Sequence, residues 1–358
     1  MRKTIFFTGA NGFLGKRILK YYLPEDMDIF LLMQEKFAPA MRGFLDEQEA
    51  SGGLRAQVRM VPGDITKPGL GLSERDGGEL RERVTEAFHL AAAYRINLPK
   101  DIGFAVNVDG TRNVLDFIGK MPGLRRLVYM STTSIFGDHR GFFGETDFDV
   151  GQNFTNHYTK TKFEAEKLVR ERMDSIPATI LRPTIVVGDS RTGEIEKIDG
   201  PYYGFVMVSR RMHLMLPRSG GVKCNIEPVD FLTSAFHAIV AREDSIGKTV
   251  HIADPSPITY DEFFDLVIEK WGTFRPILRV PGSVMRYAFY LPFLSWVTGV
   301  PRESFVYTVT PIEFGCEVML KMLEGTGISC PPVSDYIDVM IKYFREKLDR
   351  HAVKRARW

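Results

Sequence analysis

The amino-acid sequence predicts an α/β fold, with a doubly wound parallel sheet followed by a smaller, mostly helical C-terminal region. Two observations lead to this prediction. Short β-rich apolar segments alternate with helical or loop stretches through the first half of the chain, as in parallel sheets that helices cover on both faces. The first such segment, residues 4–7, runs directly into a glycine-rich turn and a helical pattern. We therefore place a nucleotide-binding domain at 1–190 and a substrate-binding region at 191–358, with 228–255 returning to the first domain.

The composition is that of a globular protein and narrows the classes of partner. Of 358 residues, 44% are apolar and 26% are charged, which suits one large domain or two smaller ones. The formal net charge of +2 gives no reason to expect nucleic acid as a partner. Cys224, Cys316 and Cys330 show neither a CxxC spacing nor a histidine cluster, so we expect reduced packing cysteines and no metal site. Because the first strand begins by Thr4, we expect no signal peptide and a cytoplasmic protein.

The turn after the first strand, residues 8–15, reads Thr-Gly-Ala-Asn-Gly-Phe-Leu-Gly. Its three glycines have the spacing of a dinucleotide-binding turn: the first allows the tight turn, the second lets backbone approach a pyrophosphate, and the third packs helix on strand. A helical pattern over 13–23 follows and stops at Pro24. Strand, turn and helix in this order predict a Rossmann-type unit, with a purely structural turn as the alternative. We assign cofactor contacts to Gly9, Asn11, Gly12, Phe13, Leu14 and Gly15.

Further strands are predicted at 28–33, 58–61, 87–90, 127–130 and 179–181, with a helix after Asp230 and a late strand at 251–254. Small or polar residues follow several of the early strands, at 63–65, 91–93, 131–132 and 182–183. In a parallel sheet these ends line the ligand crevice. We expect Asp64 to accept a hydrogen bond from an adenine amine and Ala91 and Ala92 to let the cofactor lie against backbone. Taken singly, each cluster can also be a turn or a helix cap.

A tyrosine and a lysine stand four residues apart at Tyr158 and Lys162, in a segment that reads as a helix. That spacing places both side chains on one helix face. A nearby ammonium can lower the pKa of a phenol, which is ordinarily near 10, and so make it an acid usable near neutral pH. One such pair is expected by chance in a chain of this composition. A second pair, Tyr343 and Lys347, lies in a charged helix and is assigned to a solvated face.

Together these motifs resemble the extended short-chain dehydrogenase/reductases over about the first 190 residues. Within that group the chain is most similar to the thioester-reductase and fatty acyl-CoA reductase branch, through Arg-Pro-Thr-Ile-Val-Val-Gly-Asp-Ser-Arg-Thr-Gly-Glu at 182–194, Val-Asp-Phe at 229–231 and Cys-Pro-Pro at 330–332. The motifs that carry the wider resemblance are Thr-Gly-x-x-Gly-Phe-Leu-Gly (8–15), Gly-Asp-Ile (63–65), His-Leu-Ala-Ala (89–92), Asn-Val-x-Gly-Thr (107–111), Ser-Thr (131–132), Tyr-x-x-x-Lys (158–162) and Leu-Arg-Pro (181–183).

The resemblance implies a role for each matching residue. Tyr158 corresponds to the catalytic acid/base, and Lys162 to the partner that lowers its pKa and holds the nicotinamide ribose. Thr132 corresponds to the hydroxyl that binds the substrate oxygen, with Ser131 as the alternative one position earlier. Asn107 matches an asparagine linked to cofactor binding and proton relay. The remaining cofactor contacts implied by the family pattern are Gln34, Lys36, Asp64, Ile65, Ala91, Ala92 and Pro183.

The residue that reads the adenosine ribose falls near Gln34, at the end of the second strand. Many NADP-using relatives have arginine there, whereas NAD users tend to have an acid, and Gln34 is neither. Lys16, Arg17 and Lys36 could neutralise a 2′-phosphate, and Glu35 could instead accept a hydrogen bond from a free 2′-hydroxyl. We favour NADP(H) over NAD(H).

The substrate is expected to be long and apolar. Residues 284–300 are almost all apolar or aromatic, but their length, Arg286 and Pro292 argue against a membrane span. The segment suits either a buried lid over a pocket or a helix that dips into a bilayer surface. The last stretch, 347–358, holds five Lys/Arg against Asp349, which favours a solvated end, with contact to anionic lipid as the alternative.

Three functions agree with these residues. The first is an NAD(P)H-dependent reductase that converts a long-chain acyl thioester to aldehyde, or onward to alcohol. The second is a lipid or sterol ketone/alcohol dehydrogenase, and the third is a non-catalytic nucleotide sensor, which would have no use for an activated phenol. For the first function the expected partners are acyl-CoA or a carrier-bound acyl group, with the carrier protein supplied in trans. The family resemblance also suggests a homodimer through helices that flank Tyr158.

Overall fold

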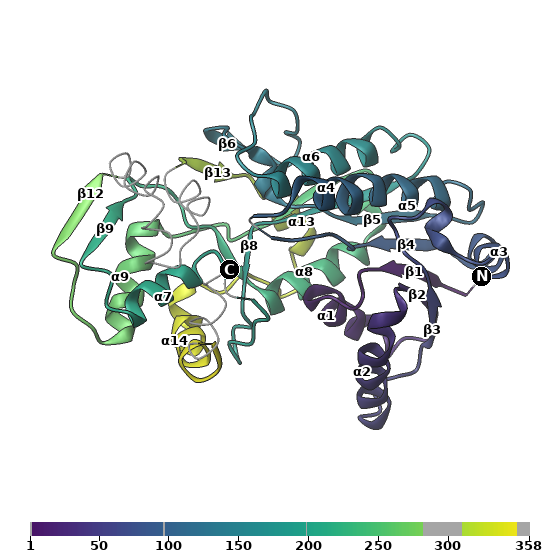
Figure 1. Cartoon of the computed structure of the whole chain (residues 1–358), viewed down its shortest axis with the longest axis horizontal. Coiled ribbons are helices and arrows are strands. Elements are labelled where there is room, and N and C mark those ends of the chain that lie inside the picture. The colour runs from purple at the N-terminus through teal and green to yellow at the C-terminus, as the bar shows by residue number, and fades with distance from the viewer. Residues whose placement is uncertain (1, 96, 198, 282–309, 349–358) are drawn as a thin grey trace.

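A parallel β-sheet forms the centre of the larger lobe in this computed structural model, which describes residues 2–95, 97–197, 199–281 and 310–348 (Figure 1). Within those residues the sheet has seven strands in the order β3-β2-β1-β4-β5-β7-β11, and every neighbouring pair is parallel. The first half of this order is that of a mononucleotide-binding unit. The strands are β1 (Thr4–Thr8), β2 (Asp28–Met33), β3 (Gln57–Pro62), β4 (Glu86–His89), β5 (Arg126–Met130), β7 (Ala178–Pro183) and β11 (Thr249–Ile252).

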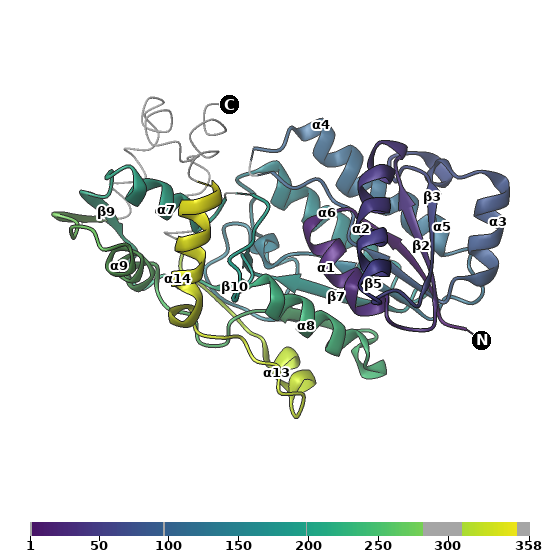
Figure 2. The same ribbon diagram turned by 90° about the horizontal axis from the view of Figure 1, so that it is seen from below.

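Helices cover both faces of the sheet, because successive apolar strand residues point to opposite sides. Ile5 and Phe7 pack into one core with α1 (Phe13–Tyr22), α2 (Ala38–Ala50) and α8 (Val229–Val240). Phe6, between them, packs into the opposite core with α3 (Glu74–Arg83), α5 (Gly110–Ile118) and α6 (His157–Arg170). Figures 1 and 2 show the two helix layers on either side of the strands. The doubly wound fold predicted from the sequence is confirmed.

A late segment of the chain returns to this sheet. Strand β11 pairs with β7 at the sheet edge, and α8 packs against α1 beneath it. The helix begins at Val229, so Asp230 lies inside its first turn and does not precede it as a cap. The Asp230 carboxylate instead accepts hydrogen bonds from the Ser190 backbone N–H (2.8 Å) and hydroxyl (2.6 Å), which anchors the loop after the short strand Ile185–Val187 to this helix.

The second lobe lies at the end of the molecule opposite β3 (Figures 1 and 2). Its apolar core joins α7 (Tyr202–Ser209), α9 (Tyr260–Trp271) and α14 (Val333–Tyr343). The start of α9 is fixed by a capping box between Thr259 and Glu262, and its end by Gly272 in the left-handed conformation. The sequence patterns missed three short parallel pairs: β8 (Ile185–Val187) with β10 (Ile226–Pro228), β9 (Met215–Arg218) with β12 (Leu278–Pro281), and β6 (Gly141–Phe143) with β13 (Ile312–Phe314).

The remaining described helices are short. They are α4 (Lys100–Gly103), α13 (Glu317–Leu323), the 3₁₀ turns Glu35–Phe37, Pro68–Gly71, Thr133–Phe136 and Glu243–Ser245, and the π-helical turns Phe104–Asp109 and Phe344–Leu348. In the described ranges, none of the helices combines the length and apolar character needed to cross a bilayer. The 284–300 segment, expected as a lid or interfacial helix, lies outside the described residues, as does the chain after 348. Lys347 is exposed at the end of its helix.

Candidate active site

The glycine turn between β1 and α1 is shaped by close backbone contacts. Gly9 has a φ of +83°, and a Cβ there would lie 2.5 Å from the Ala91 backbone nitrogen. A Cβ on Gly15 would lie 2.1 Å from the Gly9 carbonyl oxygen, so helix and turn can approach only without a side chain. At Gly12 the nearest protein atom to a Cβ would be 3.4 Å away. The turn therefore leaves room outside Gly12, in front of the α1 N-terminus, for the pyrophosphate of a dinucleotide.

A cavity of about 630 Å³ opens in front of this turn and extends between the two lobes. Its wall includes most of the residues that the sequence assigned to cofactor and catalysis. On the nucleotide side the assigned residues that line it are Gly9, Asn11, Gly12, Phe13, Leu14, Gly15 and Ala92, and in its middle they are Thr132, Tyr158, Lys162 and Pro183. The far wall belongs to the second lobe and is mainly apolar: Ile195, Tyr203, Gly204, Met207, Tyr260, Phe263 and Phe264.

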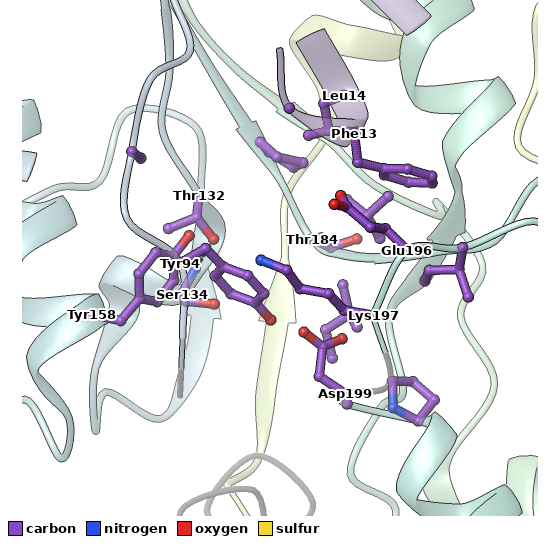
Figure 3. A pocket seen from close by; sticks show the side chains of 18 of the residues that line it. Phe13, Leu14, Tyr94, Thr132, Ser134, Tyr158, Thr184, Glu196, Lys197 and Asp199 are labelled. Carbon is purple, nitrogen blue, oxygen red and sulfur yellow. Dashed lines mark hydrogen bonds between the residues drawn. The ribbon is translucent and has the colours of Figure 1, made fainter. Parts of the chain in front are cut away.

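The two adjacent hydroxyls at the end of β5 have different surroundings. The Ser131 hydroxyl donates a hydrogen bond of 2.6 Å to the buried Glu166 carboxylate. The Thr132 hydroxyl accepts one from the Ser134 backbone N–H at 3.1 Å, which leaves its own proton available to donate. Figure 3 shows the Thr132 and Tyr158 side chains directed to the same part of the cavity.

Lys162 is buried below the cavity floor and is 3% exposed. Its ammonium donates hydrogen bonds to the Met130 carbonyl oxygen (2.7 Å) and to the Tyr129 hydroxyl (3.0 Å). Burial lowers the pKa of Lys162 to about 7, although the Glu166 carboxylate acts to raise it. An ammonium has three donors, so one remains beyond these two contacts for a cofactor ribose.

Helix α6 carries Tyr158, Lys162 and Glu166 at intervals of four residues, and therefore on one face. Its N-terminus is capped by Asn156, whose side chain accepts from the Thr159 N–H at 2.9 Å. Glu166 forms a fully buried ion pair with Arg182 on β7, at 2.6 Å. Burial alone would raise the pKa of Glu166, but Arg182 outweighs this effect and the pKa is lowered to about 2. The ion pair fixes the helix against the sheet, with Tyr158 and Lys162 lining the cavity.

Asn107 lies in the π-helical turn before α5 and is outside the described lining of the cavity. Its side-chain oxygen accepts from the Ala93 N–H (2.7 Å), and its amide donates to the Ala93 carbonyl (3.2 Å) and to the Thr161 hydroxyl (3.0 Å). These contacts connect the loop after β4 to α6. The geometry gives Asn107 a supporting role in the site.

The adenosine end of the site contains a second group of predicted residues. The Gln34 amide donates to the Asp64 carboxylate at 2.8 Å, and Thr66 donates to the other carboxylate oxygen. Burial raises the pKa of Asp64, but these hydrogen bonds and the Lys67 charge lower it overall. The Ile65 side chain packs against Gly110. A Cβ at Gly110 would lie only 2.9 Å from it. Gln34, Lys36, Asp64, Ile65 and Ala91 lie outside the described lining of the cavity.

The three cations considered for a 2′-phosphate have different partners. Arg17 pairs with Glu194 at 2.7 Å and lies over the Phe13 ring, so it connects α1 to the loop after β8. Lys16 and Lys36 lie over the Phe44 and Phe37 rings. Of the three, Arg17 is the one already engaged by a carboxylate.

The sequence patterns did not identify a polar cluster that faces Tyr158 across the cavity. The Tyr94 ring meets the Tyr158 ring edge to face at 4.9 Å, and the Tyr94 side chain hydrogen-bonds Asp199. The Lys197 ammonium lies 5.7 Å from the Tyr94 ring centre. Burial raises the pKa of Asp199, while Tyr94 and Lys197 lower it. Figure 3 shows the Tyr94 ring between Tyr158 and the other two side chains. The signal available in the sequence was the position of Tyr94 directly after the alanines that follow β4.

No group of three or more His, Cys, Asp or Glu side chains in the described part of the chain could hold a metal ion. The glycine cradle, the helix N-terminus and the hydroxyl, phenol and ammonium groups instead suit a dinucleotide that lies along the sheet end. Fold and cavity together define a class, the NAD(P)-dependent oxidoreductases of the extended short-chain type.

Comparison with known proteins gives the family. Residues 7–236 match the family described as Male sterility protein, and the chain therefore belongs to it. This membership, in the thioester-reductase branch of the extended short-chain enzymes, agrees with the resemblance found in the motifs.

Three relatives show the range of this similarity. The fatty acyl-CoA reductase wat of Drosophila melanogaster is 28% identical over 276 residues, which are 66% of this chain and 53% of the fly protein. A 3beta-hydroxysteroid-dehydrogenase/decarboxylase of Arabidopsis thaliana is 23% identical and matches 85% of this chain and 54% of its own. The terminal R domain of the myxalamid PKS-NRPS biosynthetic pathway has a TM-score of 0.79 and 28% identity, with 98% and 92% of the two chains covered. The chain thus spans about half the length of these two curated relatives.

Proposed function

We propose that the protein reduces the carbonyl carbon of a long-chain, apolar acyl thioester to the aldehyde, with NADP(H) as cofactor. One observation carries the proposal: Thr132, Tyr158 and Lys162 lie in the middle of a single cavity, between the glycine turn and a wall of apolar side chains. The names of the fly acyl-CoA reductase and of the myxalamid R domain support a thioester as the substrate. Gln34 stands where an NAD user tends to have an acid, and Lys16 and Lys36 could neutralise a 2′-phosphate, so we favour the phosphorylated cofactor.

In the proposed reaction, Thr132, Tyr158 and Lys162 have different roles. The bound nicotinamide supplies the hydride. Thr132 and Tyr158 donate hydrogen bonds to the carbonyl oxygen, where negative charge develops, and Tyr158 then gives its proton to that oxygen. Lys162 places a positive charge beneath the phenol, which stabilises the phenolate that remains. The hemithioacetal formed in this way collapses to aldehyde and free thiol, and a second reduction of the aldehyde would give the alcohol.

The acyl group is proposed to lie against the aromatic wall of the second lobe. Phe263, Phe264 and Tyr260 come from α9, and Met207 comes from α7, so the two helices would hold the chain between them. The thiol portion would then leave past Tyr94 and Asp199. CoA and a carrier protein in trans present the same thioester chemistry at this point, and each is a donor to test.

A ketone or alcohol of a lipid or sterol is the second candidate substrate, and the similarity to the plant hydroxysteroid dehydrogenase favours it. The catalytic side chains would serve this reaction equally well, because the same oxygen receives the same hydrogen bonds. The two reactions differ in their products, since only a thioester releases a thiol.

The test is a panel of acyl-CoAs of increasing chain length, aldehydes and ketones, each with NADPH and NADH and with thiol detection. We expect one thiol released per hydride transferred to acyl-CoA, with NADPH preferred. Reversible turnover of a ketone without any thiol would contradict the proposal and support the second candidate. Faster turnover with NADH would overturn the cofactor assignment alone.

Replacing Tyr158 by Phe should reduce turnover by about 10²- to 10⁴-fold, the usual contribution of a general acid. Cofactor affinity, measured by fluorescence titration, should stay near that of the wild type. Tyr343→Phe is the matched control, because it removes the phenol of the other Tyr-x-x-x-Lys pair. Unchanged turnover in Tyr158→Phe would remove Tyr158 from the mechanism.

A further inference from the structure

The ammonium of Lys162 is held from below by a side chain that the family resemblance does not assign. The Tyr129 hydroxyl lies 3.0 Å from Lys162 Nζ, and the ammonium also lies 4.6 Å from the centre of the Tyr129 ring. Tyr129 is on β5, two residues before Ser131, and is 1% exposed. Lys162 is thus in contact with both the oxygen and the ring face of one buried phenol.

Behind Tyr129 a chain of buried polar groups continues across the sheet ends. Tyr129 is hydrogen-bonded to Thr111, whose hydroxyl lies 3.0 Å from His89 Nε2. His89 Nδ1 lies 2.7 Å from the Thr8 hydroxyl. Thr8, His89, Thr111 and Tyr129 are each about 1% exposed. This row of hydrogen-bonded polar groups therefore extends, away from solvent, from Lys162 to Thr8, the residue immediately before Gly9 in the nucleotide-binding turn.

While Lys162 is charged, the chemistry of these groups allows only one direction of donation along this row of hydrogen bonds. An ammonium can only donate, so the Tyr129 oxygen accepts and its proton points to Thr111. Thr111 then donates to His89 Nε2, and the Nδ1–H donates to Thr8, which requires neutral histidine in the Nδ1–H form. Burial, and then the Lys162 charge, lower the pKa of His89 to about 3, in agreement with a neutral ring.

We propose that Tyr129 is a positioning residue that holds Lys162 as a cation beneath the cofactor cleft, and that Thr111 and His89 orient its hydroxyl for this purpose. The inference rests on the role proposed for Lys162. Under this proposal the side chain that supports Lys162 comes from β5. Asn107 does not take this part, because its side chain is bound to Ala93 and Thr161.

Few other groups around Lys162 could set its charge. On its own helix these are Tyr158 and Glu166, and Glu166 is paired with Arg182 and Arg170. From β4 there is neutral His89, and from β5 there are the Met130 carbonyl and the Tyr129 hydroxyl. Among the described residues, the Tyr129 oxygen is therefore the one side-chain hydrogen-bond acceptor of this ammonium, and its removal should disfavour the charged form.

The experiment compares Tyr129→Phe with the wild type in two pH series. Loss of the acceptor should lower the pKa of Lys162 by about one unit, a tenfold change, the size typical of one hydrogen bond to a charged group. The high-pH limb of the kcat profile should then move about one unit toward acid. The pH dependence of NADPH affinity, measured by fluorescence titration without substrate, should move by the same amount. Thr111→Val should shift both in the same direction by less.

Tyr22→Phe is the matched control, because Tyr22 is a buried tyrosine in the core on the opposite face of the sheet, and its hydroxyl has no hydrogen-bond partner among the described residues. It should leave both profiles in place. Unmoved profiles in both Tyr129→Phe and Thr111→Val would overturn the proposal and leave Tyr129 as a packing residue. Lys162→Met tests the role proposed for Lys162 separately from the role proposed for Tyr129. If this variant keeps full turnover, the role proposed for Lys162 fails. A failure confined to the Tyr129 and Thr111 variants leaves that role intact.

Discussion

At the scale of single residues, hydrogen-bond partners separate neighbours that the sequence cannot distinguish. Ser131 and Thr132 both carry a hydroxyl at the end of β5, and either could match the substrate-binding hydroxyl of the family. Ser131 uses its proton on buried Glu166, whereas Thr132 accepts from a backbone N–H and keeps its proton. A hydroxyl that has already donated cannot stabilise an oxyanion. These hydrogen-bond partners therefore favour Thr132 as the hydroxyl that binds the substrate oxygen, and Ser131 as a structural partner of Glu166.

Alanine substitutions should separate these two roles. Thr132→Ala should lower kcat/KM by about 10²- to 10³-fold, as for loss of one oxyanion donor, with little change in the free energy of unfolding. Ser131→Ala should lower the free energy of unfolding by about 1 kcal/mol, because Glu166 loses one buried hydrogen bond, and should retain most of the activity. Steady-state kinetics and urea unfolding of both variants test this. The reverse pattern would assign the catalytic hydroxyl to Ser131.

At the scale of elements, helix α6 carries the side chains proposed for catalysis, Tyr158 and Lys162, and a buried ion pair anchors it. Glu166 on this helix is completely buried and forms an ion pair with Arg182, which is equally buried. Arg182 also donates to the Asp147 carbonyl and to His251 Nε2, and His251 Nδ1 donates to the Gly315 carbonyl at 2.7 Å. The helix is thereby connected to β7, β11 and the segment before α13. Removing one partner of a buried ion pair costs more stability than replacing both partners by apolar residues, because it leaves an unpaired charge in the interior.

Glu166→Gln should therefore lower the free energy of unfolding by about 3 kcal/mol at pH 7, because Arg182 keeps its charge without a counter-ion. The pKa of Glu166 falls from 4.5 to about 2 on folding. Its stabilising contribution is present above pH 4.5 and is lost as the pH falls toward 2. Urea unfolding between pH 7 and pH 3 should show the gap between wild type and variant narrowing below pH 4.5.

Exposed Glu171, at the end of the same helix, supplies the control for that prediction. Glu171→Gln should leave the free energy of unfolding within about 0.5 kcal/mol of the wild type, as for most surface substitutions. A Glu166→Gln variant as stable as Glu171→Gln across the whole pH range would show that the buried pair does not anchor α6.

At the scale of the whole molecule, the sequence predicts the first lobe far better than the second. Several strands of the first lobe contain continuous apolar runs, such as residues 29–33, and the contact with a pyrophosphate fixes the spacing of the glycine turn. In the second lobe the strands are three or four residues long, too short for a period to show. The contact between Tyr94 and Asp199 joins residues more than a hundred positions apart, and local patterns carry no information on such pairings. Local motifs could therefore predict most of the cavity residues on the first lobe, whereas they could not predict those on the second lobe.

The substrate half allows a prediction about chain length, because one glycine sets the space between α7 and α9. A Cβ on Gly204 would lie 3.0 Å from Cε1 of Phe264, and both residues line the cavity. Gly204→Val should narrow the space and shift the kcat/KM optimum to shorter acyl chains, and Phe264→Ala should shift it to longer or bulkier ones. Each methylene that loses its contact is worth about 0.8 kcal/mol, or roughly fourfold in kcat/KM. A series of acyl-CoAs of increasing length measures both shifts, and equal losses at every length in both variants would place the acyl chain elsewhere.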